Sequence, residues 1–455
     1  MQLAWPLIIS SSSFAVLNFC DRLFLSWYSE DAFRASLPAG VLFFTLVCGF
    51  MAVAGFANTF VAQMWGAGDY KGCAQATAQG IIFSGISFFL ILLMLPLGIW
   101  LLRLTGHAPP VLRMEEDYFR ILIWSGGGMV LSSALSSFFS GRGKTFIVMG
   151  SNLAANAINI FFNYLFIFGK GGFPEMGIEG AGWATVIGAW LTPCIFAVVY
   201  FSRSNRKRFQ TFKMLRYNAS LFRRLIRFGV PAGVEWFLDV AAFTIFVLVL
   251  GRIGEVAHIA SNIALSINLI AFMPMVGLGI AASILVGQYL GRNDSKNATR
   301  VGWLAFRIGL SYVAVIGLSF LLFPFFYIGV FMGNISPAVS ELELRHMVQI
   351  LLAILAVWGF ADATALTLSG ALKGAGDTHF VMRFRLFVSW GVLVPLQVLV
   401  VLVFKWGVYA SWFCTLFYIL ILAVGFIWRF RSDRWKNIDL LDRKNKTPTI
   451  IPYEV

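Results

Sequence analysis

The sequence predicts an all-α membrane protein with twelve transmembrane helices in two six-helix bundles. Apolar residues make up 59% of its 455 residues and charged residues only 12%, against about 45–50% and about 25% in a soluble domain. Apolar stretches of about 20 residues, long enough to cross a bilayer as a helix, recur along the whole chain. In addition, the two halves of the sequence repeat each other.

Each apolar stretch is expected to be a helix, because the alternating short segments of a membrane β-barrel are absent from the sequence. The first stretch begins almost at Met1, contains the run Ser10 to Ser13 and Asp21, and lacks the exit site of a cleavable signal peptide. It is therefore expected to be a span. The expected spans cover residues 3–27, 36–64, 74–102, 116–140, 146–168, 179–201, 226–250, 257–289, 299–330, 344–373, 380–404 and 406–429.

The distribution of positive charge predicts the orientation. The formal net charge is +14, and most Lys and Arg residues fall in the tail and in or next to loops on the side of the N-terminus, with Arg383 and Arg385 counted among them. Basic residues concentrate on the cytoplasmic side of membrane proteins. We therefore expect a cell inner membrane protein with both termini in the cytoplasm. The positive charge is interpreted as topological, and no nucleic-acid partner is expected.

A basic segment divides the chain. The stretch 202–227 carries nine basic residues and no acidic one. We expect an N-terminal six-helix lobe over residues 1–201 and a cytoplasmic linker over 202–225. A C-terminal six-helix lobe over 226–429 and a basic cytoplasmic tail over 430–455 are expected to follow.

The two halves match at an offset of 225 residues. Pro6 matches Pro231, and a loop pattern in the first half matches one in the second: Val61, Gln63, Gly66, Asp69 and Lys71 against Val286, Gln288, Gly291, Asp294 and Lys296. The segment GRGKTFIVM from residue 141 similarly resembles GAGDTHFVM from residue 374. Each half has an even number of expected spans, so both enter the membrane in the same orientation. Two bundles related by a pseudo-two-fold axis along the membrane normal are the expected result.

All but four of the Asp and Glu residues lie in loops, tails or span ends; the four are Asp21, Glu235, Asp239 and Asp362. A charge near the bilayer centre costs about 2.5–3.5 kcal/mol, so each needs compensation. Glu235 and Asp239 share one helix face, just after Pro231, whose ring frees backbone carbonyls. Because few cationic partners are expected in the spans, mobile cations are expected: protons, Na⁺ or a cationic substrate. One Na⁺ held by Glu235, Asp239 and Asp362 is one such arrangement; protonated or hydrogen-bonded packing residues are the structural alternative.

Asparagines form a second polar feature. Asn156, Asn159 and Asn163 are spaced by three and four residues, which places them on one stripe of a helix. Asn262 and Asn268 lie in the eighth expected span. Such residues either line a cavity or join helices by hydrogen bonds. The sequence leaves both interpretations open.

Motifs of other function classes are incomplete. The GKT at residue 143 lacks the glycine of a phosphate-binding loop, because Phe138 stands at that position. Four histidines are scattered near span ends, and five cysteines show no paired spacing. No zinc site or disulfide framework is therefore expected. We expect no enzyme and no cofactor apart from a coupling ion.

Six segments together carry a family resemblance: VAQMWGAGD from residue 61, GRGKT from 141, NIFFNYLFIFGKGGFPEMGIEGAGWAT from 159, FGVPAGVEWFLDV from 228, VGQYLGRND from 286 and FADATALTLSGALKGAGDT from 360. In these segments the chain resembles the MATE (multidrug and toxic compound extrusion) family, in its NorM-like branch. The resemblance extends over nearly the whole chain, from Leu3 to about Arg429.

This resemblance implies a two-lobed, twelve-helix antiporter that exports organic cations in exchange for Na⁺ or H⁺. FLDV here matches a pattern like FFEV in NorM-like members, which assigns a coupling role to Asp239. Asp362 and Asp21 match the acids of spans ten and one. The chain departs from the pattern in having Asp for Glu in span seven, the additional Glu235, and Arg22 after Asp21 where a small polar residue is usual.

Two functions are compatible with the sequence. In the first, a monomer in the lipid bilayer exports small cationic amphipathic substrates by alternating access, and substrate and ion exclude each other from the same negative site. The alternative is a lipid-linked saccharide flippase of the same superfamily, which needs Arg or Lys facing its cavity. If Arg22 and Arg307 face lipid or loops, export is favoured, whereas a central basic groove containing them favours the flippase.

Overall fold

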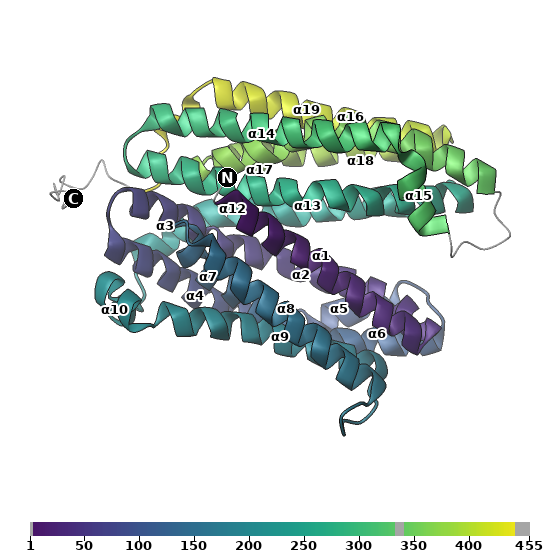
Figure 1. Cartoon of the computed structure of the whole chain (residues 1–455), viewed down its shortest axis with the longest axis horizontal. Coiled ribbons are helices and arrows are strands. Elements are labelled where there is room, and N and C mark those ends of the chain that lie inside the picture. Colours follow the sequence, from purple (N-terminus) through teal and green to yellow (C-terminus); the bar gives the residue numbers. More distant parts are fainter. Residues whose placement is uncertain (1–2, 333–340, 442–455) are drawn as a thin grey trace. The chain divides into compact units, whose positions relative to one another are not determined.

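The structure is a computed structural model that describes residues 3–332 and 341–441. Over these residues the chain is helical and contains no strand (Figure 1). It divides into two compact units. The first contains residues 3–237, 287–293 and 439–441, and the second contains residues 238–286, 294–332 and 341–438.

Nine helices cover the first six expected spans within the described residues: α1 (Ala4–Tyr28), α2 (Glu30–Gly55), α3 (Ala57–Gly66), α4 (Tyr70–Leu93), α5 (Leu95–Arg103), α6 (Pro109–Leu122), α7 (Ser125–Ser140), α8 (Thr145–Phe168) and α9 (Gly177–Tyr200). Three of the spans are interrupted, between α2 and α3, α4 and α5, and α6 and α7. The last of these pairs is bent by 41°.

The remaining helices are α10 (Arg203–Phe209), α11 (Thr211–Met214), α12 (Ala219–Leu250), α13 (Glu255–Gly291), α14 (Ser295–Leu322), α15 (Pro324–Met332), α16 (Glu341–Ala375), α17 (Thr378–Val388), α18 (Val394–Gln397) and α19 (Gly407–Arg431). Short π-helical turns, Ser389–Leu393 and Val398–Val403, flank α18. Eleven helices of the described chain are long and apolar enough to cross a membrane, and the bent α6–α7 pair makes a twelfth span. The predicted twelve-helix fold is confirmed. The predicted lobe boundary at residue 226 falls inside α12.

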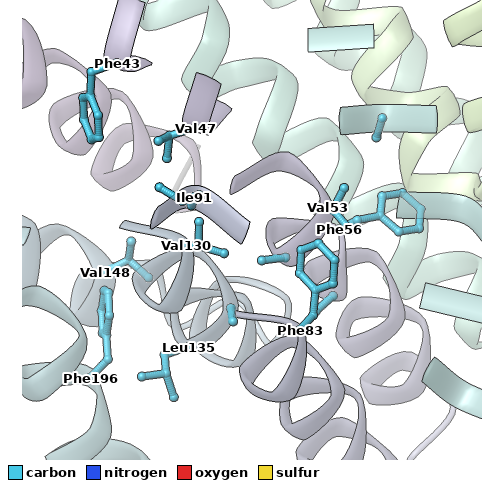
Figure 2. Close-up of a cluster of buried hydrophobic side chains, with 14 of the residues drawn as sticks. Phe43, Val47, Val53, Phe56, Phe83, Ile91, Val130, Leu135, Val148 and Phe196 are labelled. Carbon is cyan, nitrogen blue, oxygen red and sulfur yellow. The ribbon is translucent and has the colours of Figure 1, made fainter. Parts of the chain in front are cut away.

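The first unit is held by a continuous apolar core. Val47, Ile91 and Val130 are completely buried and lie together in this core, with aromatic rings such as Phe83 and Phe196 around them (Figure 2). Small residues allow the helices to approach closely here, as is typical of membrane bundles.

The internal repeat is visible as a reciprocal contact inside the first unit. A Cβ atom at Gly66 on α3 would collide with the backbone carbonyl of Gln288 on α13, and one at Gly291 would collide with that of Gln63. These residues are the same pairs that the 225-residue offset relates. The glycine of each repeat thus contacts the glutamine of the other repeat, and such a reciprocal contact is what a two-fold axis produces. The Gln288 amide also donates to the Gly141 carbonyl at 2.8 Å.

Arg142, next to this contact, packs its guanidinium on aromatic rings. The guanidinium carbon lies 3.7 Å from the centroid of the Phe138 ring and 4.4 Å from that of Phe209. Its Nε donates to the Phe138 carbonyl at 2.7 Å. Burial lowers the pKa of the Arg142 guanidinium to about 10, and ring contacts of this kind favour the charged form.

Part of the predicted tail is folded onto the protein. Trp435, in the 3₁₀ turn Arg434–Asn437, is completely buried and stacks on Phe430, with ring centroids 4.9 Å apart. Both residues belong to the second unit. Five residues later, Leu440 is 1% exposed within the apolar core of the first unit. The tail beyond residue 441 lies outside the described residues.

Candidate functional site

A polar cavity of about 250 Å³ lies in the first unit among α1, α2, α7, α8 and α9. Its polar lining consists of hydroxyls and amides without a charged residue, and its apolar lining comes mainly from α1, α2 and α7. The lining residues are Ser10, Phe14, Leu17, Phe44, Met51, Met129, Ser132, Ser133, Ser136, Asn152, Asn156, Asn159, Thr185, Gly188, Ala189 and Thr192. The serines of α7 were not predicted, because serine occurs throughout the spans and carries no distinctive spacing there.

The predicted asparagine stripe runs along this cavity. Asn156 donates from its side-chain amide to Ser13 Oγ at 3.0 Å, and Asn152 donates to Ser10 Oγ at 2.6 Å. Asn156 and Asn159 also line the cavity. The stripe therefore has both of the roles that the sequence left open: it joins α8 to α1, and it presents amides to a cavity.

Asp21 lies at the end of the same stripe. The amide of Asn163, which is completely buried, donates to Asp21 Oδ1 and also to Asn159 Oδ1 at 2.9 Å. Among the described residues, Asn163 Oδ1 has no hydrogen-bond partner. The site therefore combines a carboxylate with a buried amide oxygen that lacks a donor. Leaving such an acceptor unpaired costs about 1–3 kcal/mol.

The second unit contains an ion pair that the sequence did not predict. Arg385 on α17 was counted with the cytoplasmic loop charges, but its side chain is only 10% exposed, inside an apolar helix long enough to span the membrane. Its Nη1 lies 2.7 Å from Asp239 Oδ2. Tyr418 donates its hydroxyl hydrogen to Asp239 Oδ1 at 3.1 Å, and Ser389 donates to the Tyr418 oxygen at 3.1 Å. The expectation of acids without a fixed counter-charge is thus wrong for Asp239.

Asp362 on α16 belongs to this cluster, because its carboxyl group interacts electrostatically with both Arg385 and Asp239. Glu235 is buried, at 5% exposure, on the part of α12 that belongs to the first unit. Among the described residues, no three His, Cys, Asp or Glu side chains are grouped as a metal site requires. Asn262 is exposed on α13 in the second unit and does not line the cavity of the first.

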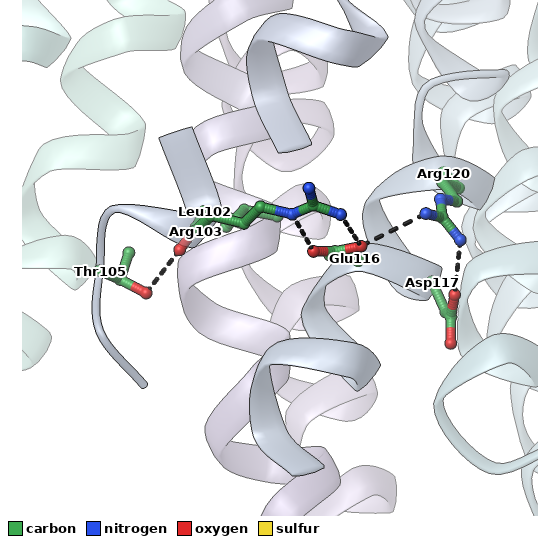
Figure 3. Close-up of polar contacts among 6 residues, drawn as sticks. All are labelled: Leu102, Arg103, Thr105, Glu116, Asp117 and Arg120. Carbon is green, nitrogen blue, oxygen red and sulfur yellow. Dashed lines mark hydrogen bonds and ion pairs between the residues drawn. The ribbon is translucent and has the colours of Figure 1, made fainter. Parts of the chain in front are cut away.

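Other basic residues near span ends are used in ion pairs or are exposed. Figure 3 shows Arg103 and Arg120 converging on Glu116, with N–O distances of 2.7 and 3.3 Å. Arg22 lines a separate cavity of about 470 Å³ in the first unit, whereas Arg307 is exposed on α14 of the second. The polar cavity described above contains neither of them.

Comparison with known proteins decides the family. Residues 6–165 and 231–399, more than half of the chain, match the family MatE. The chain belongs to the MATE family. The protein is thus a multi-pass membrane transporter, and MATE transporters are not enzymes. The two matched segments begin at Pro6 and Pro231, the prolines that the internal repeat relates.

Curated MATE relatives are similar over nearly their whole length. A "Probable multidrug resistance protein NorM" of Brucella suis is 26% identical over 448 residues, covering 96% of this chain and 92% of the relative. A protein of the same description from Mesorhizobium japonicum is 29% identical, covering 90% and 87%. A solved outward-facing MATE transporter of the MOP superfamily superposes with a TM-score of 0.86 at 19% identity, covering 96% of both chains. That likeness supports the fold.

Proposed function

We propose that this MATE protein is a multidrug antiporter that exports organic cations in exchange for an inward-moving Na⁺ or H⁺. It acts in the cell inner membrane, with both termini in the cytoplasm. The names of its NorM relatives, which describe multidrug resistance proteins, support the substrate class. Half-buried carboxylates within the spans of each unit support a cationic cargo: Asp21 in the first, and Asp239 and Asp362 in the second.

The observation that carries the proposal is the Asp21–Asn163 site beside the polar cavity. The Asp21 carboxylate needs positive charge, and Asn163 Oδ1 needs a hydrogen-bond donor. An ammonium group supplies both at once, because it carries a charge and several N–H donors. The apolar rings and thioethers of the cavity lining suit the rest of an amphipathic cation.

Exchange follows from competition for this charge. A proton on Asp21 removes the negative charge that attracts the drug, and a bound drug cation disfavours protonation. Each ligand thus weakens the other, and by linkage the two effects are equal. When the two ligands also favour different orientations of the transporter, uptake of one drives release of the other.

Liposomes containing the purified protein test this function. Efflux of ethidium, a fluorescent organic cation, is followed under an imposed Na⁺ gradient and, separately, under an imposed H⁺ gradient. One gradient is expected to drive transport, and Asp21→Asn is expected to abolish it while the protein stays folded and inserted. Normal transport by Asp21→Asn refutes the assigned site. Absence of transport under either gradient, in folded wild-type protein, refutes the antiport function.

The flippase alternative requires basic residues at the substrate site. The polar cavity of the first unit is lined by hydroxyls, amides and apolar groups, and Arg385 in the second unit is paired with Asp239. These observations favour a cationic substrate at the polar cavity and at Asp239. The separate cavity lined by Arg22, Arg34 and His107 is the place where the anionic group of a flippase substrate would bind. Transport of a lipid-linked saccharide, in liposomes where ethidium is not moved, is the result that supports the flippase instead.

A further inference from the structure

The second unit holds a fixed cation against one of its coupling carboxylates. We propose that Arg385 is the built-in counter-ion of Asp239 and that it restricts the second unit to proton coupling by taking the place of Na⁺. The inference rests on the proposed antiport function, since it names the ion that this function leaves open. It concerns an arginine that was counted with the cytoplasmic charges.

Both carboxylate oxygens of Asp239, whose side chain is 32% exposed, already have a partner. One carboxylate oxygen meets Arg385 at 2.7 Å and the other accepts the Tyr418 hydroxyl at 3.1 Å. Na⁺ is a hard cation that needs several oxygen ligands at once. To gain Asp239 as a ligand, Na⁺ has to displace the guanidinium, whose charge is then buried without its partner. Breaking a buried pair in this way is strongly unfavourable.

Four helices surround this cluster with charged or titratable groups. Asp239 comes from α12, Asp362 from α16, Arg385 from α17 and Tyr418 from α19. Glu235 lies one turn before Asp239 on α12. Arg385 pairs with Asp239, and Asp362 is the second carboxyl group of the cluster in this unit. A proton neutralises a carboxyl group without any coordination shell, which is the property that a crowded, partly compensated site requires.

Removing the arginine is therefore expected to create a sodium site. Thermal unfolding of purified protein in detergent is measured in NaCl, KCl and choline chloride at constant ionic strength. The wild type is expected to unfold at the same temperature in all three salts. Arg385→Gln is expected to be stabilised by Na⁺ alone, because Asp239 and Asp362 are then released for a mobile cation. Its Na⁺ affinity should exceed that of the wild type by roughly tenfold or more, because Na⁺ no longer has to displace a buried guanidinium from Asp239.

Two further variants make the experiment specific. Arg383→Gln removes a charge two residues earlier, at an exposed position of the same helix, and is expected to behave as the wild type. Adding Asp239→Asn to Arg385→Gln is expected to abolish the sodium response. Arg385→Lys keeps the positive charge and is expected to exclude Na⁺ as the wild type does.

The outcomes separate this inference from the antiport function, because binding is measured without transport. Stabilisation of the wild type by Na⁺, lost in Asp239→Asn, overturns the inference and leaves antiport intact. A folded Arg385→Gln protein that ignores Na⁺ also overturns it. Should Arg385→Gln not fold, Arg385→Lys and the wild type decide in the same three salts, each compared with Asp239→Asn: no Na⁺ stabilisation that depends on Asp239 supports the inference, and Na⁺ stabilisation that Asp239→Asn removes overturns it. Wild-type liposomes that move no cation under either gradient refute antiport, while the sodium titration still tests Arg385.

Discussion

Replacing Gly66 by alanine tests the reciprocal contact between the repeats. A Cβ atom at this position lies far inside van der Waals distance of the Gln288 carbonyl oxygen, and 2.9 Å from the carbonyl carbon. Non-bonded heavy atoms are ordinarily separated by about 3.5 Å or more, so the end of α13 has to move away from α3. Rotation of a side chain does not relieve this overlap, because the atoms that are met belong to the backbone.

Overpacking of this kind costs about 1–3 kcal/mol. If this strain is relieved when α3 and the end of α13 separate, the equilibrium ratio of molecules with the contact closed to molecules with it open falls by about 5–150-fold. Gly291→Ala is expected to have the same effect, because its Cβ meets Gln63 in the same way. Gly40→Ala is the matched control. Gly40 also lies in a helix, but nothing lies within 4 Å of its Cβ position, so alanine there should be neutral or slightly stabilising.

Amide hydrogen exchange followed by mass spectrometry measures this opening. Peptides that cover residues 60–68 and 286–293 are expected to exchange faster in Gly66→Ala and Gly291→Ala, because exchange reports local opening. The same peptides should be unchanged in Gly40→Ala. Wild-type exchange rates in Gly66→Ala, together with an unchanged unfolding temperature, refute the close approach of the two backbones.

Three other substitutions test single contacts. Asn163→Ala removes a charge-assisted hydrogen bond to the first-unit carboxylate and should weaken ethidium binding by roughly tenfold or more, since such bonds are worth about 1.5–3 kcal/mol; fluorescence titration measures it, and unchanged affinity contradicts the assigned site. Arg429→Ala leaves Asp377 buried without its partner at 2.7 Å and should lower the free energy of unfolding by about 3–5 kcal/mol. The control Arg431→Ala, at an exposed position, should change the free energy of unfolding by less than about 0.5 kcal/mol. Equal losses of stability in Arg429→Ala and Arg431→Ala contradict the assigned role of the Arg429–Asp377 pair. Trp435→Ala should cost about 3–5 kcal/mol, and denaturation that matches the wild type shows that the tail is not anchored.

The spans were predictable because apolar length and helix formation are local properties. The chain has no water in the bilayer to satisfy its backbone, so each long apolar stretch must become a helix. The breaks within spans were not predictable. Phe56, between α2 and α3, is an ordinary apolar residue with a helical backbone conformation, and the glycine before it is one of many glycines within the spans, so it does not single out this interruption.

The polar sites were predictable only in part. Asp21 and the asparagines of α8 stood out because polar groups are rare and costly in a span. Their partners on other helices did not, because spacing along one helix says nothing about what a second helix places opposite. Arg385 was counted with the cytoplasmic charges for a related reason: charge counting separates the two sides of a membrane, but it does not show which arginine pairs with a carboxylate inside the bundle.

The last described residues contain two buried anchor side chains that are close together in the sequence. Trp435 is embedded in the second unit and Leu440 in the first. Five residue steps, fully extended, reach at most about 18 Å. Trp435 and Leu440 therefore stay within this distance of each other, even when one of the two side chains leaves its core. Leu440, with less apolar surface to expose, is the anchor expected to yield first.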